Sequence, residues 1–200
     1  MNVIGINASP RKNANTQTLV EAVLDGAAAR GAQTRLVNLR DLNINGCLGC
    51  EGCKKHLGKC VQKDDLTPLL QEMTAYDGIV MGTPVYWYQV SGQFKMLVDR
   101  LYSFIGFGEN PETGESTYES AFPTGKNFVF VISRGDPEPA PLLPQLYDHL
   151  NEWFNLIPFS LGAGSYEMLH QYGTDNDRKS AANDKPLLEK ARRAGAVLVS

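Results

Sequence analysis

Short apolar runs alternate along this chain with longer stretches in which apolar residues recur every three or four positions. A short apolar run is typical of a strand buried on both faces, and the longer repeat is typical of a helix with one buried side. Five runs predict strands, at Asn2–Ala8, Gln33–Leu39, Gly78–Thr83, Asn127–Ser133 and Pro158–Leu161. Five stretches predict helices, at Thr16–Gly31, Asp64–Tyr76, Ser91–Gly106, Leu142–Leu156 and Lys185–Val199.

This alternation indicates the fold class. Strands that alternate with helices form parallel sheets whose faces are both covered, and right-handed crossovers give a doubly wound order. We therefore expect an α/β fold with a doubly wound, five-stranded parallel sheet and helices on both faces. Residues 107–125 and 162–184 are polar and fit no element, so we expect long loops there, of the kind that is usually functional or covers a neighbour. We find no repeat or linker and expect residues 1–200 to form a single domain.

Composition and charge exclude several classes of protein. The chain has 200 residues, 42% of them hydrophobic and 20% charged, and a formal net charge of −3. Proteins that bind duplex nucleic acid are usually basic, so we expect no nucleic acid partner. No apolar run approaches the roughly 18 residues of a membrane-spanning helix, and the opening MNVIGINASPRK lacks the features of a signal peptide. We therefore expect a cytoplasmic protein without a membrane partner.

The turn after the first predicted strand is rich in hydroxyl and amide side chains and leads into a helix. The free N–H groups and the dipole of a helix start favour a bound anion. Ser9, Asn15 and Thr16 can donate to phosphate oxygens, and Arg11 adds a positive charge. The turn matches neither the dinucleotide motif nor the P-loop, so a single terminal phosphate suits it best. An ordinary helix cap with two exposed cations is the alternative interpretation.

Aromatic residues crowd the turn Thr83–Gln89, after the third predicted strand. In open α/β sheets ligands bind at the carboxyl ends of the strands, and Tyr86, Trp87 and Tyr88 can flank a planar conjugated ring there. Packing of these aromatics against the long loops or a second subunit is the alternative. We expect the turn at 133–136, after the fourth strand, to complete the pocket.

All four cysteines lie in the glycine-rich segment 46–61, at Cys47, Cys50, Cys53 and Cys60. The run C-x2-C-x2-C with a fourth cysteine nearby is a recurring way to hold a [4Fe–4S] cluster. Zinc usually takes two separated cysteine pairs, and disulfide frameworks spread their cysteines along the chain. An iron–sulfur cluster, a zinc ion and metal-free reduced thiols all remain open at this stage.

Two motifs resemble those of a known family. Ser9-Pro10-Arg11 followed by Asn15-Thr16, and Gly82-Thr83-Pro84-Val85-Tyr86-Trp87 followed by Ser91, Lys95 and Asp99-Arg100, resemble the flavodoxin-like NAD(P)H-dependent FMN reductases. The resemblance covers roughly residues 1–135. It implies a flavodoxin-like, FMN-binding domain and NAD(P)H as a transient electron donor. It also implies FMN contacts, which together with those expected from the turns are Ser9, Arg11, Asn15, Thr16, Pro84, Val85, Tyr86, Trp87, Ser133 and Gly135.

The cysteine motif resembles that of the iron–sulfur flavoproteins, a branch of the same fold. This implies that the four cysteines ligate one [4Fe–4S] cluster per subunit and that the protein is a homodimer or homotetramer. We expect an FMN-dependent oxidoreductase that passes electrons through FMN and the cluster to a redox partner protein or a small-molecule acceptor. The alternatives are an FMN, quinone or nitro reductase without a cluster, and a non-enzymatic electron carrier. We assign no general base, because a flavin carries its own chemistry, and a substrate role for His170 stays open.

Overall fold

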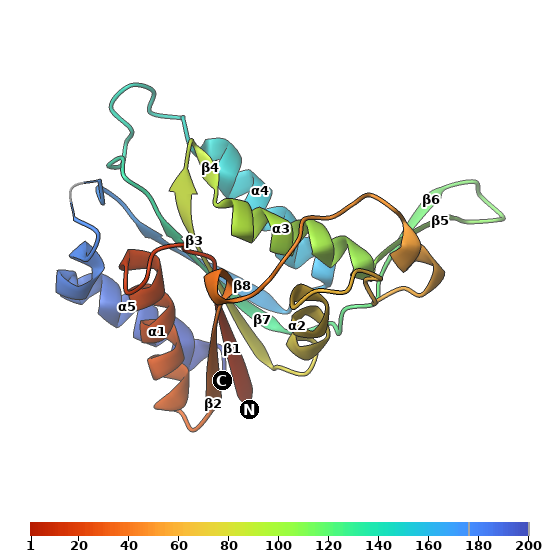
Figure 1. Ribbon diagram of the computed structural model, residues 1–200, viewed down its shortest axis with the longest axis horizontal. Coiled ribbons are helices and arrows are strands. Elements are labelled where there is room, and N and C mark those ends of the chain that lie inside the picture. Colours follow the sequence, from red (N-terminus) through yellow and green to blue (C-terminus); the bar gives the residue numbers. More distant parts are fainter. Residues whose placement is uncertain (176, 200) are drawn as a thin grey trace.

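The computed structural model describes residues 1–175 and 177–199 and has a central parallel sheet (Figure 1). The strand order is β2-β1-β3-β7-β8, and every neighbouring pair is parallel. The strands are β1 (Asn2–Asn7), β2 (Gln33–Asn38), β3 (Gly78–Tyr86), β7 (Asn127–Ser133) and β8 (Ser165–Gln171). This is the predicted doubly wound, five-stranded sheet, to which a two-residue strand, β4 (Gln89–Val90), adds an antiparallel pairing with the end of β3.

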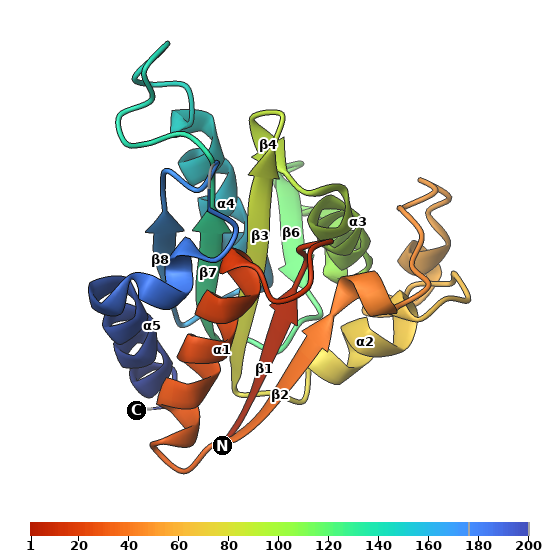
Figure 2. The ribbon, with the colours of Figure 1, turned by 60° about the vertical axis from the view of Figure 1, so that its left-hand side comes forward.

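Helices cover both faces of the sheet (Figure 2). One face carries α1 and α5, whose residues form a core with the sheet; the other carries α2, α3 and α4 over a second core rich in phenylalanine. The helices are α1 (Asn15–Ala28), α2 (Leu66–Met73), α3 (Gly92–Leu101), α4 (Asp148–Leu161) and α5 (Lys185–Val197). Short 3-10 turns are at η1 (Leu39–Asp41), η2 (Gly52–Lys55), η3 (Tyr102–Phe104) and η4 (Ser180–Asn183).

Glycine lets α1 and α5 pack backbone against backbone. A Cβ atom on Gly26 would lie 1.9 Å from the carbonyl oxygen of Arg192, and one on Gly195 would lie 1.8 Å from that of Val23. Any larger side chain at either position would force the helices apart.

The fifth strand lies elsewhere than predicted. Residues 158–161 are the last turn of α4, and the strand is β8, inside the stretch predicted to be a loop at 162–184. Pro158 and Leu161 continue the buried side of α4, and Phe159 is exposed. The helix ends because Gly162 adopts a left-handed conformation with φ of 67°. β8 is an edge strand in which buried and half-buried residues mix with exposed ones, so its apolar signal is weak.

Other boundaries also differ. The predicted loop at 107–125 is largely a β-hairpin, β5 (Ile105–Glu109) with β6 (Ser116–Ser120), which projects from the body of the molecule in Figure 1. The helix predicted over Ser91–Gly106 is α3, which ends at Leu101. The helix predicted over Leu142–Leu156 is α4, which begins at Asp148. None of the described helices is both long and apolar enough to cross a membrane.

Candidate functional site

A polar cavity of about 180 Å³ lies where the chain leaves the carboxyl ends of β1, β3 and β7. We call it the carboxyl-edge cavity. Nine of the ten predicted FMN contacts line it, and Trp87 is the exception: Ser9, Arg11, Asn15, Thr16, Pro84, Val85, Tyr86, Ser133 and Gly135. These residues come from three separate turns, which only the parallel sheet brings together.

Buried hydrogen bonds hold the three turns in place. The hydroxyls of Thr16 and Ser133 lie 2.6 Å apart and join the start of α1 to the end of β7. Ser91 Oγ donates to the carbonyl of Ala8 at 2.8 Å, and the Ser91 N–H donates to Thr83 Oγ1 at 3.0 Å. The ends of β1 and β3 and the start of α3 are thereby fixed relative to one another.

The start of α1 is pressed against β3 and left without a capping side chain. A Cβ atom on Gly82 of β3 would lie only 2.5 Å from Val20 of α1, so the glycine permits the close approach. The N-cap residue is Ala14, which has no side chain to accept from the N–H groups of Thr16 and Gln17. Those groups are the usual partners of a capping oxygen, and an anion can take its place.

Asn15 behaves differently from the expected phosphate donor. Its Nδ2 donates to the carbonyl of Asp177 at 2.9 Å, and its Oδ1 accepts from the N–H of Ala181 at 2.9 Å. Its own N–H donates to the carbonyl of Arg178 at 3.1 Å. The side chain is therefore engaged in holding the loop after β8 against the start of α1.

The turn between β3 and β4 exposes its aromatic side chains. Trp87 and Tyr88 have φ of 49° and 63°, a left-handed conformation that costs a residue other than glycine roughly 1–2 kcal/mol. Trp87 is 89% exposed, and the Arg11 guanidinium lies 5.8 Å from the Tyr86 ring centre. A strained turn that holds bulky rings in solvent is a feature of binding sites, where function maintains the strain.

The turn after β7 separates the carboxyl-edge cavity from a second one of about 170 Å³. Arg134 is buried between the rings of Tyr147 and Tyr172. Its guanidinium carbon lies 4.0 Å from the centre of the Tyr147 ring and 4.5 Å from that of Tyr172. His170, predicted to lie in a loop, is on β8 and lines this second cavity. Burial lowers the pKa of His170, and the positive charges of Arg134 and Lys190 lower it further. Both effects favour the neutral form of the His170 imidazole.

The four cysteines are free thiols in different surroundings. Cys47 and Cys50 are exposed, Cys53 is half-buried and Cys60 is buried. Among the described residues, no three side chains of the metal-ligating types gather around one centre. Four thiols suit an iron–sulfur cluster chemically, but this arrangement does not bring them together.

Cys60 belongs to a buried polar network. Its Sγ accepts from Arg100 Nε at 3.0 Å. Arg100 Nη1 and Nη2 bind the two carboxylate oxygens of Asp64 at 2.9 and 3.1 Å, and Arg100 also donates to the carbonyl of Asn45 and to Thr67 Oγ1. The sequence pattern predicts Asp64 only as a helix start and does not reveal the pair, because its members are 36 positions apart.

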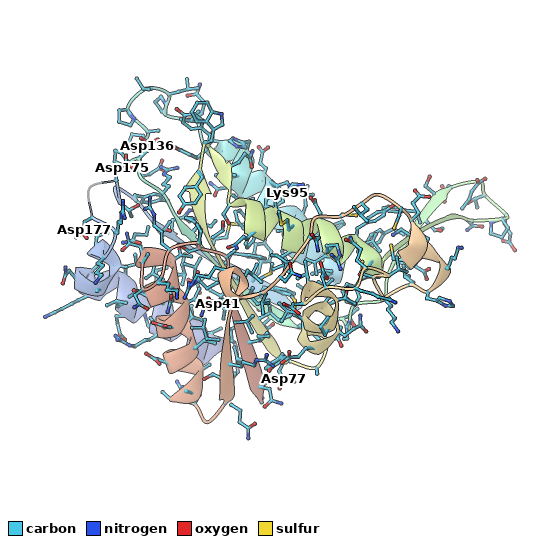
Figure 3. All side chains as sticks on the ribbon, in the orientation of Figure 1. Asp41, Asp77, Lys95, Asp136, Asp175 and Asp177 are labelled. Atoms are coloured by element: carbon cyan, nitrogen blue, oxygen red, sulfur yellow. The ribbon has the colours of Figure 1, made fainter. Side chains whose placement is uncertain are left out.

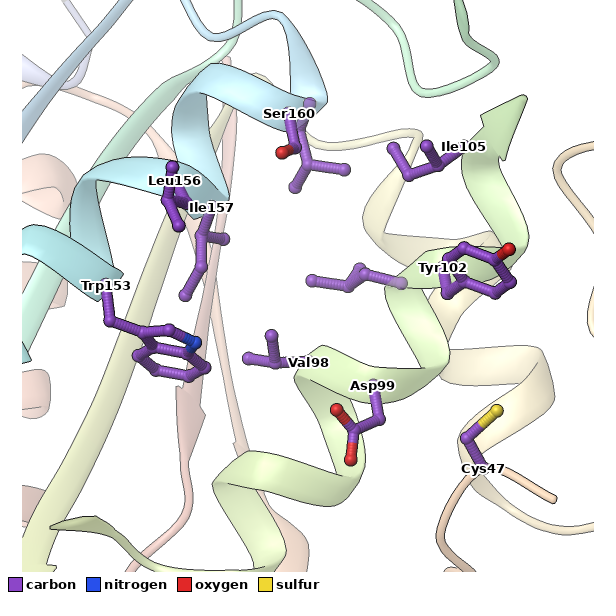
Figure 4. A pocket seen from close by; sticks show the side chains of 11 residues that line it. Cys47, Val98, Asp99, Tyr102, Ile105, Trp153, Leu156, Ile157 and Ser160 are labelled. Carbon is purple, nitrogen blue, oxygen red and sulfur yellow. The ribbon is translucent and has the colours of Figure 1, made fainter. Parts of the chain in front are cut away.

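A groove of about 400 Å³ runs between α3 and α4, away from the carboxyl-edge cavity (Figure 4). Most of its lining is apolar: Val98 lies towards Trp153 and Ile157, whereas the Tyr102 ring points away from them, to the side on which Cys47 lies. Lys95 and Asp99 on the same helix form the exposed ion pair that their spacing predicts.

Besides Ala14 at the start of α1, three lining residues of the carboxyl-edge cavity were not predicted: Thr174, Asp175 and Arg178. All three follow β8. The signal that could have found them was the strand itself, because the loop after a fifth parallel strand must emerge at the same edge of the sheet.

Curated relatives of the chain are iron–sulfur flavoproteins. One from Methanocaldococcus jannaschii is 46% identical over 100 residues, which are 50% of this chain and 51% of the relative. Over that match the chain spans about half the length of the relative. Another from Archaeoglobus fulgidus is 29% identical over 182 residues, which are 91% of this chain and 76% of the relative.

Solved structures share the fold. The NAD(P)H:quinone oxidoreductase from Methanothermobacter marburgensis has a TM-score of 0.78 at 18% identity, covering 99% of this chain and 98% of that one. An FMN-dependent NADH-azoreductase from Bacillus anthracis, in complex with FMN, has a TM-score of 0.72 at 13% identity, covering 100% of both chains. Identities this low establish the fold alone. Residues 1–153 of the 200, however, match the family model of the NADPH-dependent FMN reductases, and the chain belongs to that family.

Proposed function

We propose that this chain binds FMN by its phosphate in the carboxyl-edge cavity and passes electrons from NAD(P)H to a small-molecule acceptor or a redox partner protein. The observation that carries the proposal is the gathering of polar groups from three turns around the uncapped start of α1. Arg11 at the rim adds the positive charge that a phosphate requires.

The size of the cavity indicates how the cofactor lies. Pockets for drug-sized ligands usually measure roughly 300–1,000 Å³, and this one measures about 180 Å³. It has room for the phosphate and part of the ribityl chain. The ring system then lies outside, where Tyr86 and Trp87 can cover one of its faces, and its other face is left for a nicotinamide, a substrate or a second subunit.

Bound FMN supplies hydride and single-electron transfer. The work of this chain is to bind and orient it. Ser9 and the N–H groups of Thr16 and Gln17 hold the phosphate, the Thr16–Ser133 bond fixes the phosphate turn against the end of β7, and Trp87 shields the ring from water. No side chain is asked to act as an acid or base.

We further propose that the cysteine segment 46–61 takes up an iron–sulfur cluster in a homodimeric or homotetrameric protein. Support comes from the spacing of four free cysteines and from the names of the curated relatives. Uptake requires Cys47, Cys50 and Cys53 to move relative to Cys60, which Arg100 holds in place. The many glycines of the segment permit such movement.

The test is anaerobic purification followed by absorption spectroscopy and by iron and sulfide analysis. We expect flavin absorbance that bleaches with NADH or NADPH, together with iron and sulfide in equal amounts. Arg11→Ala should lose flavin, whereas Cys50→Ser should lose iron and keep flavin. Protein that binds no flavin would refute the main proposal, and protein with flavin but no iron would refute the cluster alone.

A further inference from the structure

We propose that the loop after β8 forms a second wall of the cofactor site, in which Arg178 binds the phosphate and Asp175 accepts a hydrogen bond from a ribityl hydroxyl. This inference rests on the proposed binding of FMN. It concerns residues outside the stretch 1–153 that matches the family model, so it assigns ligand contacts to a part of the chain that the family match does not reach.

The loop is held against both sides of the carboxyl-edge cavity. Asn15 binds it to the start of α1 through the carbonyls of Asp177 and Arg178 and the N–H of Ala181. On the other side, the N–H groups of Gly173 and Thr174 donate to the carbonyls of Asp136 and Arg134, in the turn after β7. The loop therefore bridges the phosphate turn and the turn after β7.

Asp175 lies directly on the turn after β7. A Cβ atom on Gly135 would be 1.8 Å from Asp175 Oδ1, so the carboxylate occupies the space that any other residue at position 135 would fill. Figure 3 shows Asp175 and Asp136 at the same edge of the molecule. Asp175 also lines the cavity between the phosphate turn and the turn after β7, where the ribityl chain of FMN would lie.

The charged side chains around the cavity form no salt bridge in the part of the chain that the structure describes. Among the described residues, no ion pair joins Arg11, Asp175 or Arg178 to another side chain. Asp175 and Arg178 are exposed at the rim of the cavity that they line. Two cations near the helix start suit a phosphate dianion, and an acceptor-only carboxylate suits a neutral hydroxyl.

The two roles predict different effects on FMN and on riboflavin, which lacks the phosphate. Arg178→Ala should weaken the binding of FMN about tenfold, which is the effect of losing one charge-assisted hydrogen bond. The affinity for riboflavin should not change. Asp175→Ala should weaken the binding of both flavins by a similar factor, and Asp175→Asn should restore part of the lost affinity. Arg178→Ala keeps the main-chain carbonyl that binds Asn15, so the loop stays docked.

The experiment titrates each apoprotein with FMN and with riboflavin and follows the quenching of flavin fluorescence, at low and at high salt. Lys179→Ala is the matched control, because it removes a neighbouring charge that does not line the cavity. The inference is supported if Arg178→Ala lowers the ratio of FMN affinity to riboflavin affinity, and the dependence of that ratio on salt, while Asp175→Ala and Lys179→Ala do not. It is overturned if Arg178→Ala and Asp175→Ala bind both flavins as the wild type does while Arg11→Ala loses FMN. Wild-type protein that binds neither flavin would overturn the proposed function itself, and this inference with it.

Discussion

Asp64→Asn is expected to destabilise the protein by about 3–5 kcal/mol, the usual result of leaving one member of a buried ion pair without its partner. Arg100 and Asp64 bind each other through two parallel hydrogen bonds, and their side chains are 0% and 1% exposed. Asp64 also accepts from the N–H groups of Asn45 and Thr67. An asparagine side chain would leave the guanidinium charge uncompensated and offer an amide where two acceptors are required.

The same pair predicts how stability depends on pH. Burial alone would raise the pKa of Asp64, but its hydrogen bonds and the charge of Arg100 outweigh burial and lower that pKa from 3.8 to about 2. The lowered pKa stabilises the folded state fully above the unfolded value of 3.8, and this contribution is lost as the pH falls from 3.8 towards 2. At about 1.36 kcal/mol per pKa unit, the loss amounts to about 2 kcal/mol.

The assay is urea unfolding of the wild type and of Asp64→Asn, monitored by tryptophan fluorescence, from neutral pH down to about pH 3. Asp99→Asn is the control, since it breaks an exposed ion pair on α3, the helix that carries Arg100, and should cost less than about 0.5 kcal/mol. The reasoning fails if Asp64→Asn costs no more than the control at neutral pH, or if the variant and the wild type lose stability equally as the pH falls.

Three further predictions concern other parts of the molecule. Gly195→Ala should destabilise the protein by about 1–3 kcal/mol, the usual effect of overpacking, because the added methyl would meet the carbonyl of Val23. Urea unfolding measures the loss of stability, with Ala196→Gly as a control on the same helix. Trp87→Gly should stabilise the flavin-free protein by about 1 kcal/mol by relieving the left-handed strain, and should weaken FMN binding in a fluorescence titration; a variant that binds FMN as tightly as the wild type would refute the role of this ring. His170 should titrate below its ordinary pKa, so proton NMR should show a neutral imidazole at pH 7, and a charged ring there would contradict the structure.

The strands with the clearest signal are those buried on both faces, whereas the edge strand β2 was predicted from only three apolar residues, Leu36, Val37 and Leu39. β1, β3 and β7 are unbroken apolar runs, and burial leaves such runs few alternatives. The sequence pattern did not predict β8, because an edge strand needs only some apolar positions, and its His170 and Glu167 suggest a loop. The apolar end of α4, around Pro158, resembled a strand because four residues are too few to distinguish a period of 2 from one of 3.6.

The site shows the same division. The hydroxyls and aromatics of the first two turns were visible because they directly follow strongly apolar strands. Asp175 and Arg178 were not, since their place depends on a strand that the pattern did not reveal. The spacing of the cysteines can be seen in the sequence, whereas the buried position of Cys60 depends on Arg100, 40 positions away.

The most direct test of the central claim is a crystal structure of the protein with FMN. We predict that the phosphate lies at the start of α1, within hydrogen-bonding distance of Ser9 and Arg11, and that the ring lies along the Tyr86–Trp87 turn. Flavin bound in the groove between α3 and α4, or a phosphate away from the start of α1, would contradict the account.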